Sequence, residues 1–133
     1  MHQFKLGFTF LLTVLVVELG CARLGYDIAT PDQAALMTMA HLSKAEADFF
    51  AKVHRYGALA EIIHLCPEIG SRMIDASYAA HKFSIVLTGD GYLMRADIED
   101  NRQAKFSYYC DETGVVRESH DGMPASSNSR AVR

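Results

Sequence analysis

Histidines and acidic residues are the side chains of this 133-residue chain whose types suit metal or acid–base chemistry. Of its six histidines, only His54 and His64 are close enough in sequence to share a helical corner, and no two stand four residues apart. Asp97, Glu99 and Asp100 form a small acidic cluster. Calcium takes six to eight oxygens from a loop that wraps around it, whereas this stretch has short turns. The sequence therefore predicts no metal or cofactor, with calcium as the less favoured alternative.

Sequence motifs for catalysis are not found. There is no GxSxG, P-loop, HExxH or glycine-rich dinucleotide fingerprint. Ser119, His120 and Asp121 are adjacent in a polar stretch, where they cannot adopt the geometry of a catalytic triad. The net charge of -3, without a stripe of Lys and Arg, gives no reason to expect nucleic acid. We expect a protein that is not an enzyme.

The first residues read as an export or membrane segment. Lys5 gives the start a positive charge, and an apolar run follows from Leu6 to Val17. This run is shorter than the roughly 17–25 residues of a membrane span. If Glu18 is tolerated, the span extends to Ala22 and is just long enough to cross a bilayer.

The stretch from Lys5 through Gly7-Phe8 to Val17 resembles the start of a type IV pilin or type II secretion pseudopilin. The resemblance implies that a prepilin-type peptidase cuts after Gly7 and leaves Phe8 as the mature N-terminus. Two other fates are open. A signal peptidase can remove about two dozen residues, or Cys21, preceded by Gly20, can be lipidated at a weak lipoprotein box.

Whether the cysteines can form a disulfide depends on whether the protein is exported. Three cysteines are present, and removal, lipidation or membrane burial of Cys21 leaves the pair Cys66 and Cys110. In an oxidising compartment this pair is a candidate disulfide, with two free thiols as the alternative.

The body begins with a strong helix signal. Thr30 can cap, Pro31 suits the first helical position, and Gln33 completes a capping box. Apolar residues then recur at three- and four-residue steps from Leu36 to Tyr56, with Glu46 as the one break. The pattern predicts a helix of about six turns ending near Arg55, with Gly57 as its stop.

Shorter elements follow. Residues 58–65 can form a second helix stopped by Pro67, and 71–80 is compatible with helix but ambiguous. Alternation then predicts strands at 82–87, 92–99, 105–110 and 115–118, with a turn at Thr88-Gly89-Asp90-Gly91. The fold class is therefore α+β, a long N-terminal helix packed on a small antiparallel β-meander. Three parts are expected: a leader or anchor (1–29), a globular domain (30–119) and a disordered polar tail (120–133).

Several segments of the body resemble short pilin-like proteins of environmental bacteria. They lie in a similar order and spacing between Ala34 and Arg117. The matching stretches are Ala45-Glu46-Ala47-Asp48-Phe49-Phe50, Tyr56-Gly57-Ala58-Leu59, Met73-Ile74-Asp75, Lys82-Phe83-Ser84-Ile85 and Phe106 to Arg117.

The resemblance implies an exported structural subunit of a pilus or a type II secretion pseudopilus, with other subunits and the inner membrane as partners. Pilins carry a glutamate early in the mature chain where this sequence has Leu12, and Pro31 interrupts the helix. We therefore expect weak self-assembly and a minor or accessory role. The alternative is a periplasmic or lipid-anchored binding module with a pilin-like domain and no filament.

Overall fold

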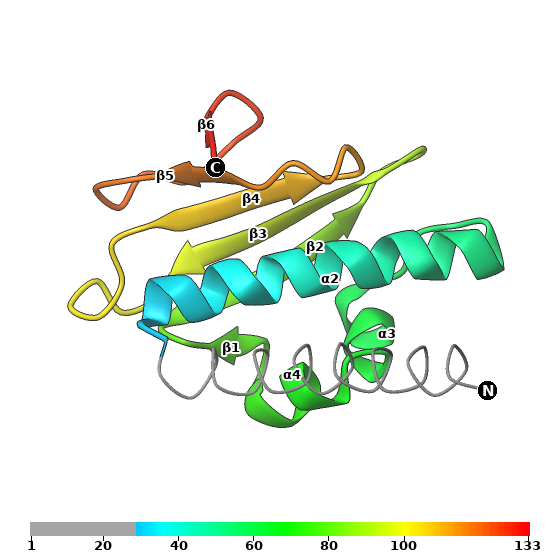
Figure 1. Ribbon diagram of the computed structural model, residues 1–133, viewed down its shortest axis with the longest axis horizontal. Helices are drawn as coiled ribbons and strands as arrows, with labels where there is room; N and C mark the ends of the chain where they lie inside the picture. Colours follow the sequence, from blue (N-terminus) through cyan, green and yellow to red (C-terminus); the bar gives the residue numbers. More distant parts are fainter. Residues whose placement is uncertain (1–28) are drawn as a thin grey trace, which may run out of the picture.

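The computed structural model describes residues 29–133. One long helix lies across a six-stranded antiparallel sheet whose strand order follows the chain, β1 to β6 (Figure 1). The α+β class is confirmed. The helices are α2 (Pro31–Val53), α3 (Leu59–His64) and α4 (Pro67–Arg72). The strands are β1 (Ser77–Tyr78), β2 (His81–Leu87), β3 (Tyr92–Ile98), β4 (Ser107–Asp111), β5 (Arg117–Ser119) and β6 (Arg130–Ala131).

The capping box predicted for α2 is formed. The Thr30 hydroxyl accepts from the Gln33 N–H at 3.2 Å, and the Gln33 side chain accepts from the Thr30 N–H at 3.1 Å. The helix ends at Val53, slightly earlier than predicted, because His54 adopts a left-handed conformation at φ 61°. Gly57, which was expected to stop the helix, lies in the turn that follows it.

Asp32 ties the start of α2 to the sheet. Its carboxylate accepts from the backbone N–H groups of Lys105 and Phe106, and its carbonyl accepts from the Tyr108 hydroxyl at 3.1 Å. These bonds fix the beginning of the helix over the beginning of β4.

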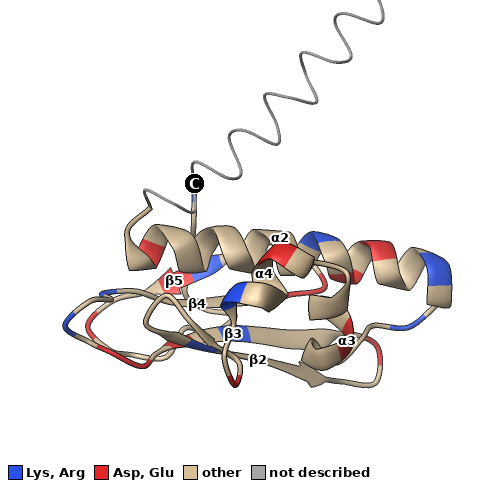
Figure 2. Cartoon of the chain, turned by 90° about the horizontal axis from the view of Figure 1, so that it is seen from below, with Lys and Arg blue, Asp and Glu red and all other residues tan. Residues whose placement is uncertain are grey.

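The core lies between α2 and the inner face of the sheet, so the domain has two layers (Figure 2). From α2, Met39 and Leu42 are fully buried, and from the sheet, Phe83 and Met94 are at most 2% exposed. The alternation predicted for β3 places Tyr92, Met94 and Ala96 on this inner face, as the pattern required. The predicted strands are therefore confirmed, with shifts of one or two residues at their ends.

The segment between α3 and β2 differs from the sequence prediction. Pro67 ends α3 but also opens α4, since proline suits the first position of a helix. Residues 73–80 are not helical. They make two tight turns, at Asp75-Ala76 and at Ala79-Ala80, in which all four residues have positive φ between 49° and 64°.

Positive φ costs an alanine about 1–2 kcal/mol, because its Cβ crowds the following carbonyl. We expect Ala80→Gly to raise the free energy of unfolding by about 0.5–1 kcal/mol. The same substitution at exposed Ala47, inside α2, should lower it by about 1 kcal/mol. Urea unfolding of both variants checks the contrast, and destabilisation by Ala80→Gly would contradict the turn geometry.

The C-terminal tail was predicted to be disordered, and this is wrong in the structure. β6 pairs with β5, and the Val132 N–H donates to the Val116 carbonyl at 2.9 Å. Arg117 donates to the Ser129 carbonyl at 2.9 Å, and Ala125 is only 3% exposed. The polar composition misled the prediction because the tail is held mainly by backbone hydrogen bonds at the edge of β5.

Candidate functional site

The proposed processing residues Gly7, Phe8 and Cys21 lie outside the described residues. Between residues 29 and 133, none of the helices has both the length and the apolar character needed to span a bilayer.

The predicted disulfide is not formed: Cys66 and Cys110 are both free thiols. Cys66 precedes α4 and lies beside Ala45 and Asp48 of α2, whereas Cys110 lies 3.6 Å from the Ser43 hydroxyl. Ser43 and Ala45 point about 160° apart around the helix, so the two thiols contact different sides of α2. Burial raises the pKa of both, which lowers their reactivity at neutral pH.

Thiol labelling tests this placement. We expect a maleimide to modify half-buried Cys66 well before fully buried Cys110 in the folded protein, without prior reduction. Mass spectrometry of the labelled peptides distinguishes them. Protection of both thiols until a reductant is added would indicate the disulfide instead.

The acidic residues considered for calcium each have a local partner. Asp97 pairs with Arg95 at 3.1 Å, Glu99 accepts from the Ser77 hydroxyl at 2.6 Å, and Asp100 accepts from the Arg102 N–H at 3.0 Å. Within residues 29–133 no group of three or more His, Cys, Asp or Glu is placed to hold a metal ion. Calcium therefore gains no support from these acids.

His81 is fully buried. Its ring nitrogens lie 2.6 Å from the Ala79 carbonyl and 2.7 Å from the Phe106 carbonyl. Carbonyl oxygens only accept hydrogen bonds, so both bonds form only when the ring carries two protons. The Asp32 Oδ1 lies 3.7 Å from the Nε2 of this ring.

Sequence reasoning treated Glu46 as a break in the apolar stripe of the helix, and missed its role. The side chain is fully buried, and its Oε1 accepts from the Gly57 N–H at 2.7 Å. Its Oε2 has no hydrogen-bond partner among the described residues. Burial raises the pKa of Glu46, and the bond from Gly57 only partly offsets this rise.

Gly57 is needed where this carboxylate meets the backbone. A Cβ at this position would lie 2.9 Å from Ile62 Cδ1 and 3.2 Å from the Phe49 ring. The glycine therefore allows α3 and the end of α2 to close over Glu46. A lone acid in an apolar stripe, followed by a glycine beyond the helix, is the sequence signal for this arrangement.

An exposed ion pair completes the connection between α2 and α3. Arg55 donates to the Glu61 carboxylate at 2.8 Å and 3.2 Å, and also to the Tyr56 carbonyl. The hydrogen bond from Arg55 lowers the pKa of Glu61 to about 2. Glu61 also accepts from the Ala58 N–H, so the pair orients the first turn of α3.

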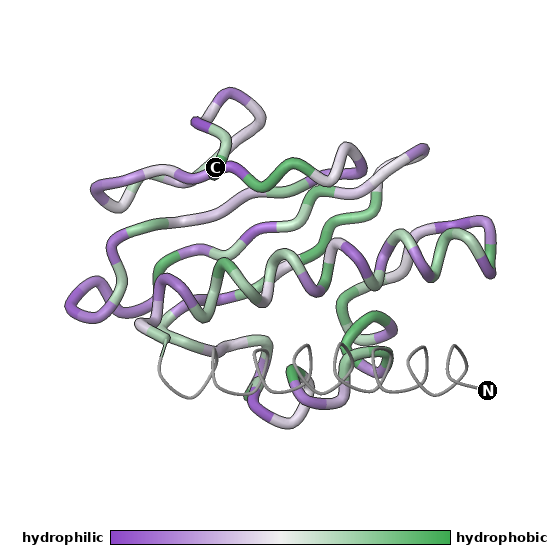
Figure 3. Tube along the Cα trace, in the orientation of Figure 1, coloured by the Kyte–Doolittle hydropathy of each residue, from purple (hydrophilic) through white to green (hydrophobic). Residues whose placement is uncertain are grey.

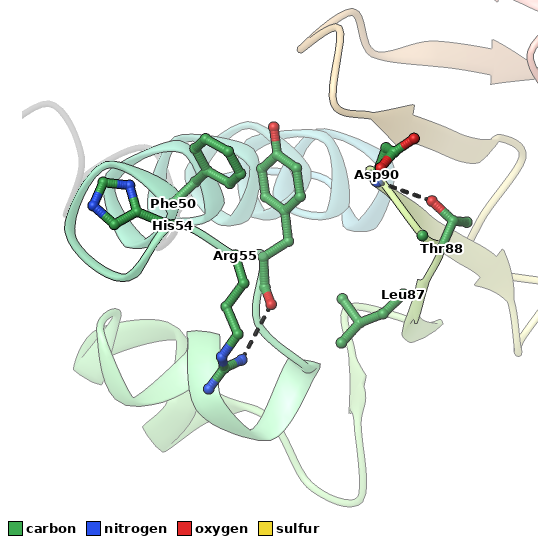
Figure 4. Close-up of a pocket in the computed structure, with 9 residues that line it drawn as sticks. Phe50, His54, Arg55, Leu87, Thr88 and Asp90 are labelled. Atoms are coloured by element: carbon green, nitrogen blue, oxygen red, sulfur yellow. Dashed lines mark hydrogen bonds between the residues drawn. The ribbon is translucent and has the colours of Figure 1, made fainter.

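A hollow of about 530 Å³ lies between this connection and the β2–β3 turn (Figure 4). The Phe50 and Tyr56 rings stack in one wall, with centroids 4.7 Å apart. Leu87 and the turn at Thr88 to Gly91 form the other wall. The hollow is lined by Phe50, His54, Arg55, Tyr56, Leu87, Thr88, Gly89, Asp90 and Gly91.

The chemistry of this hollow favours contact over catalysis. Phe50 is 42% exposed and Leu87 is 45% exposed, beside the charged side chains of Arg55 and Asp90. Exposed aromatic and aliphatic groups next to Arg are typical of protein–protein contact surfaces. We take the hollow and the adjoining end of β2 as the candidate interaction surface.

No protein-family model, no curated protein and no solved structure matches this chain.

Proposed function

We propose that this chain is an exported structural subunit of a pilus or type II secretion pseudopilus, in a minor or accessory role. Its N-terminal segment would tether it to the inner membrane, and its folded domain would meet other subunits or cargo. The proposal starts from the resemblance of the sequence to short pilin-like proteins. The order of elements supports it, because a long helix followed by an antiparallel meander is the plan of the pilin globular domain.

The observation that carries the proposal is the hydrogen bond between Glu46 and Gly57. These residues belong to two separate segments of the resemblance, the Ala-Glu helix and the Tyr-Gly turn. Their 2.7 Å contact gives the two segments one physical reason to occur together. A buried carboxylate needs a hydrogen-bond partner, and the turn supplies it here, so the helix segment and the turn segment depend on each other.

The last segment that resembles the pilin-like proteins, the hairpin from Phe106 to Arg117, also has a physical basis. The Asp111 carboxylate accepts from the Thr113 N–H at 3.0 Å, and Gly114 has a φ of 77° that suits glycine. The Asp-x-x-Gly spacing thus builds the turn from β4 towards β5. These two residues support the assignment of this segment to the pilin-like pattern.

A second candidate function is a periplasmic or lipid-anchored binding module that uses the same domain without a filament. Cys21 favours it, because a lipidated cysteine would anchor the domain without any cut after Gly7. The hollow beside the β2–β3 turn would then be the binding surface.

Substitutions in the leader separate the two functions. In a host with its own prepilin peptidase and lipoprotein enzymes, Gly7→Val should block maturation, and Cys21→Ser should leave it unchanged. Gel mobility of the full chain in isolated envelopes is the measurement. Normal maturation of Gly7→Val together with loss of anchoring in Cys21→Ser would reject the subunit and favour the module.

A further inference from the structure

The carboxyl group of Glu46 is enclosed where α2 ends and α3 begins. The side chain is 0% exposed, and its Oε1 accepts from the Gly57 N–H at 2.7 Å. Its Oε2 has no hydrogen-bond partner among the described residues. Burial of a carboxyl group with an unpartnered oxygen costs far more when the group is charged than when it is protonated. The closed arrangement therefore suits a Glu46 that carries a proton.

The connection over Glu46, residues 54–58, has the features of a hinge. His54 has a φ of 61°, a strained conformation for a residue with a side chain. Gly57 packs against Ile62 so closely that a Cβ would lie 2.9 Å from its Cδ1. The helix that follows, α3, has only six residues, and Ala58 before it has no side chain that could cap it. Short elements of this kind can open locally without unfolding of the whole domain.

We propose that Glu46 is a pH-sensitive latch: its protonated form holds the connection closed over the core, and its ionisation releases the connection together with α3. The proton passes to solvent, and the released carboxylate gains the hydration that the closed core denies it. This inference does not depend on the proposed function.

The charged groups around Glu46 come from α3 and from the connection. Burial is the main cause that raises the pKa of Glu46, and the Glu61 carboxylate on α3 raises it further. The Gly57 N–H and the Arg55 guanidinium act in the opposite direction. Arg55 is itself paired with Glu61 at 2.8 Å, so its charge is shared between the two acids. Release of the connection would free the Glu46 carboxylate to meet water and Arg55.

The titratable neighbours from the sheet side stay neutral. Burial raises the pKa of the Tyr92 phenol on β3 and of the Cys110 thiol on β4 beside it. The Tyr56 ring, from the connection, contacts the Tyr92 ring edge-on, with centroids 4.9 Å apart. The sheet therefore offers Glu46 no positive charge to stabilise its ionised form in the closed state.

The hollow depends on the latch, because the connection forms one of its walls (Figure 4). Tyr56 directly precedes Gly57, and its ring stacks on Phe50 with centroids 4.7 Å apart. Phe50 belongs to α2, whereas Tyr56 moves with the connection. The candidate interaction surface is thus complete only in the closed state.

The remainder of the fold is held independently of Glu46. Asp32 joins the start of α2 to the backbone of Lys105 and Phe106, and Leu42 is buried in the core. The trace through α3 is mostly apolar (Figure 3), and Ile62 at its centre is fully buried. Opening exposes this apolar surface, which keeps the open state rare while Glu46 is protonated.

Hydrogen exchange followed by mass spectrometry tests the latch on the full chain in detergent micelles, from pH 5 to pH 8. Each rate is divided by the intrinsic chemical rate at the same pH. The amides to compare are those of α3, where the Ile62 N–H donates to the Ala58 carbonyl, and those of β3, which pair with β2 and β4. We expect α3 amides to exchange faster than β3 amides at every pH. Their opening should increase by up to about tenfold per pH unit until the folded pKa of Glu46 is passed.

Two variants assign the response to Glu46. Glu46→Gln cannot ionise, although its carbonyl can still accept from Gly57, so its corrected α3 exchange should not change with pH. Asp48→Asn removes an exposed acid from the same helix and should keep the wild-type response.

Two results would overturn the proposal. Exchange of α3 as slow as that of β3 would mean that the connection opens only when the domain unfolds. An equal pH response in Glu46→Gln would assign it to another group. The comparison of α3 with β3 needs only the wild-type protein, so it remains decisive if Glu46→Gln does not fold.

Discussion

Leu42→Ala is expected to lower the free energy of unfolding by about 2–5 kcal/mol, the range for deleting a buried leucine side chain. Leu42 is 0% exposed and lies in the core between α2 and the sheet. Since small domains have only about 5–15 kcal/mol of stability, the variant should unfold at markedly lower urea concentration.

The matched control is Leu65→Ala. Leu65 follows α3 and is 51% exposed, so the same change should cost well under half as much. Urea unfolding followed by circular dichroism measures both. Equal losses for the two leucines would mean that α2 does not pack on the sheet as described.

Glu46→Ala is the second large effect expected. It leaves the buried Gly57 N–H without an acceptor, which costs about 1–3 kcal/mol, and the cavity adds to this loss. The measurement is urea unfolding at pH 5. The control is Asp48→Ala on the exposed side of the same helix, which should change stability little. A neutral Glu46→Ala would contradict the role assigned to this bond.

Glu46 also predicts a dependence on pH. Its pKa is raised above the ordinary value of 4.5 in the folded protein, so the folded state retains the proton longer than the unfolded chain. Stability from this group is complete below pH 4.5 and falls as the pH rises through the folded pKa. In Glu46→Gln this dependence disappears, while the side-chain carbonyl can still accept from Gly57.

The comparison to make is the stability of wild type minus that of Glu46→Gln, measured from pH 4.5 to pH 8. We expect this difference to decrease as the pH rises above 4.5 and to become constant above the folded pKa. A constant difference would show that the carboxylate titrates as it does in the unfolded chain.

The sequence was sufficient for elements with local signals. Thr30 and Gln33 fix the start of α2, and the alternation from Tyr92 to Ile98 fixes the faces of β3. The turn at Thr88 to Gly91 likewise follows from its glycines and is closed by a 3.0 Å bond from the Thr88 N–H to the Gly91 carbonyl.

Long-range partners were not visible in the sequence. The placement of β6 depends on a free edge of β5, and the tail itself has no strand signal. The separation of Cys66 from Cys110 depends on which sides of α2 they face. The left-handed Ala79 and Ala80 have no sequence signal either, since such turns favour Asn and Gly.

The candidate surface was missed for the same reason. The apolar run Ile85-Val86-Leu87 was read as an ordinary strand, and only the short length of β1 leaves its edge open. In the sequence, Glu46 only interrupts the apolar stripe of α2. Its partner, the Gly57 N–H, lies eleven residues later and beyond the helix, so the helical pattern does not reveal it.

The central claim, an exported subunit processed as a pilin, is tested most directly by the mass and N-terminal chemistry of the mature protein. The protein should be isolated from a host with its native processing enzymes. The account predicts a chain beginning at Phe8, with a methylated amine. A chain beginning at lipidated Cys21, or just beyond it without lipid, would contradict the subunit and leave the periplasmic module.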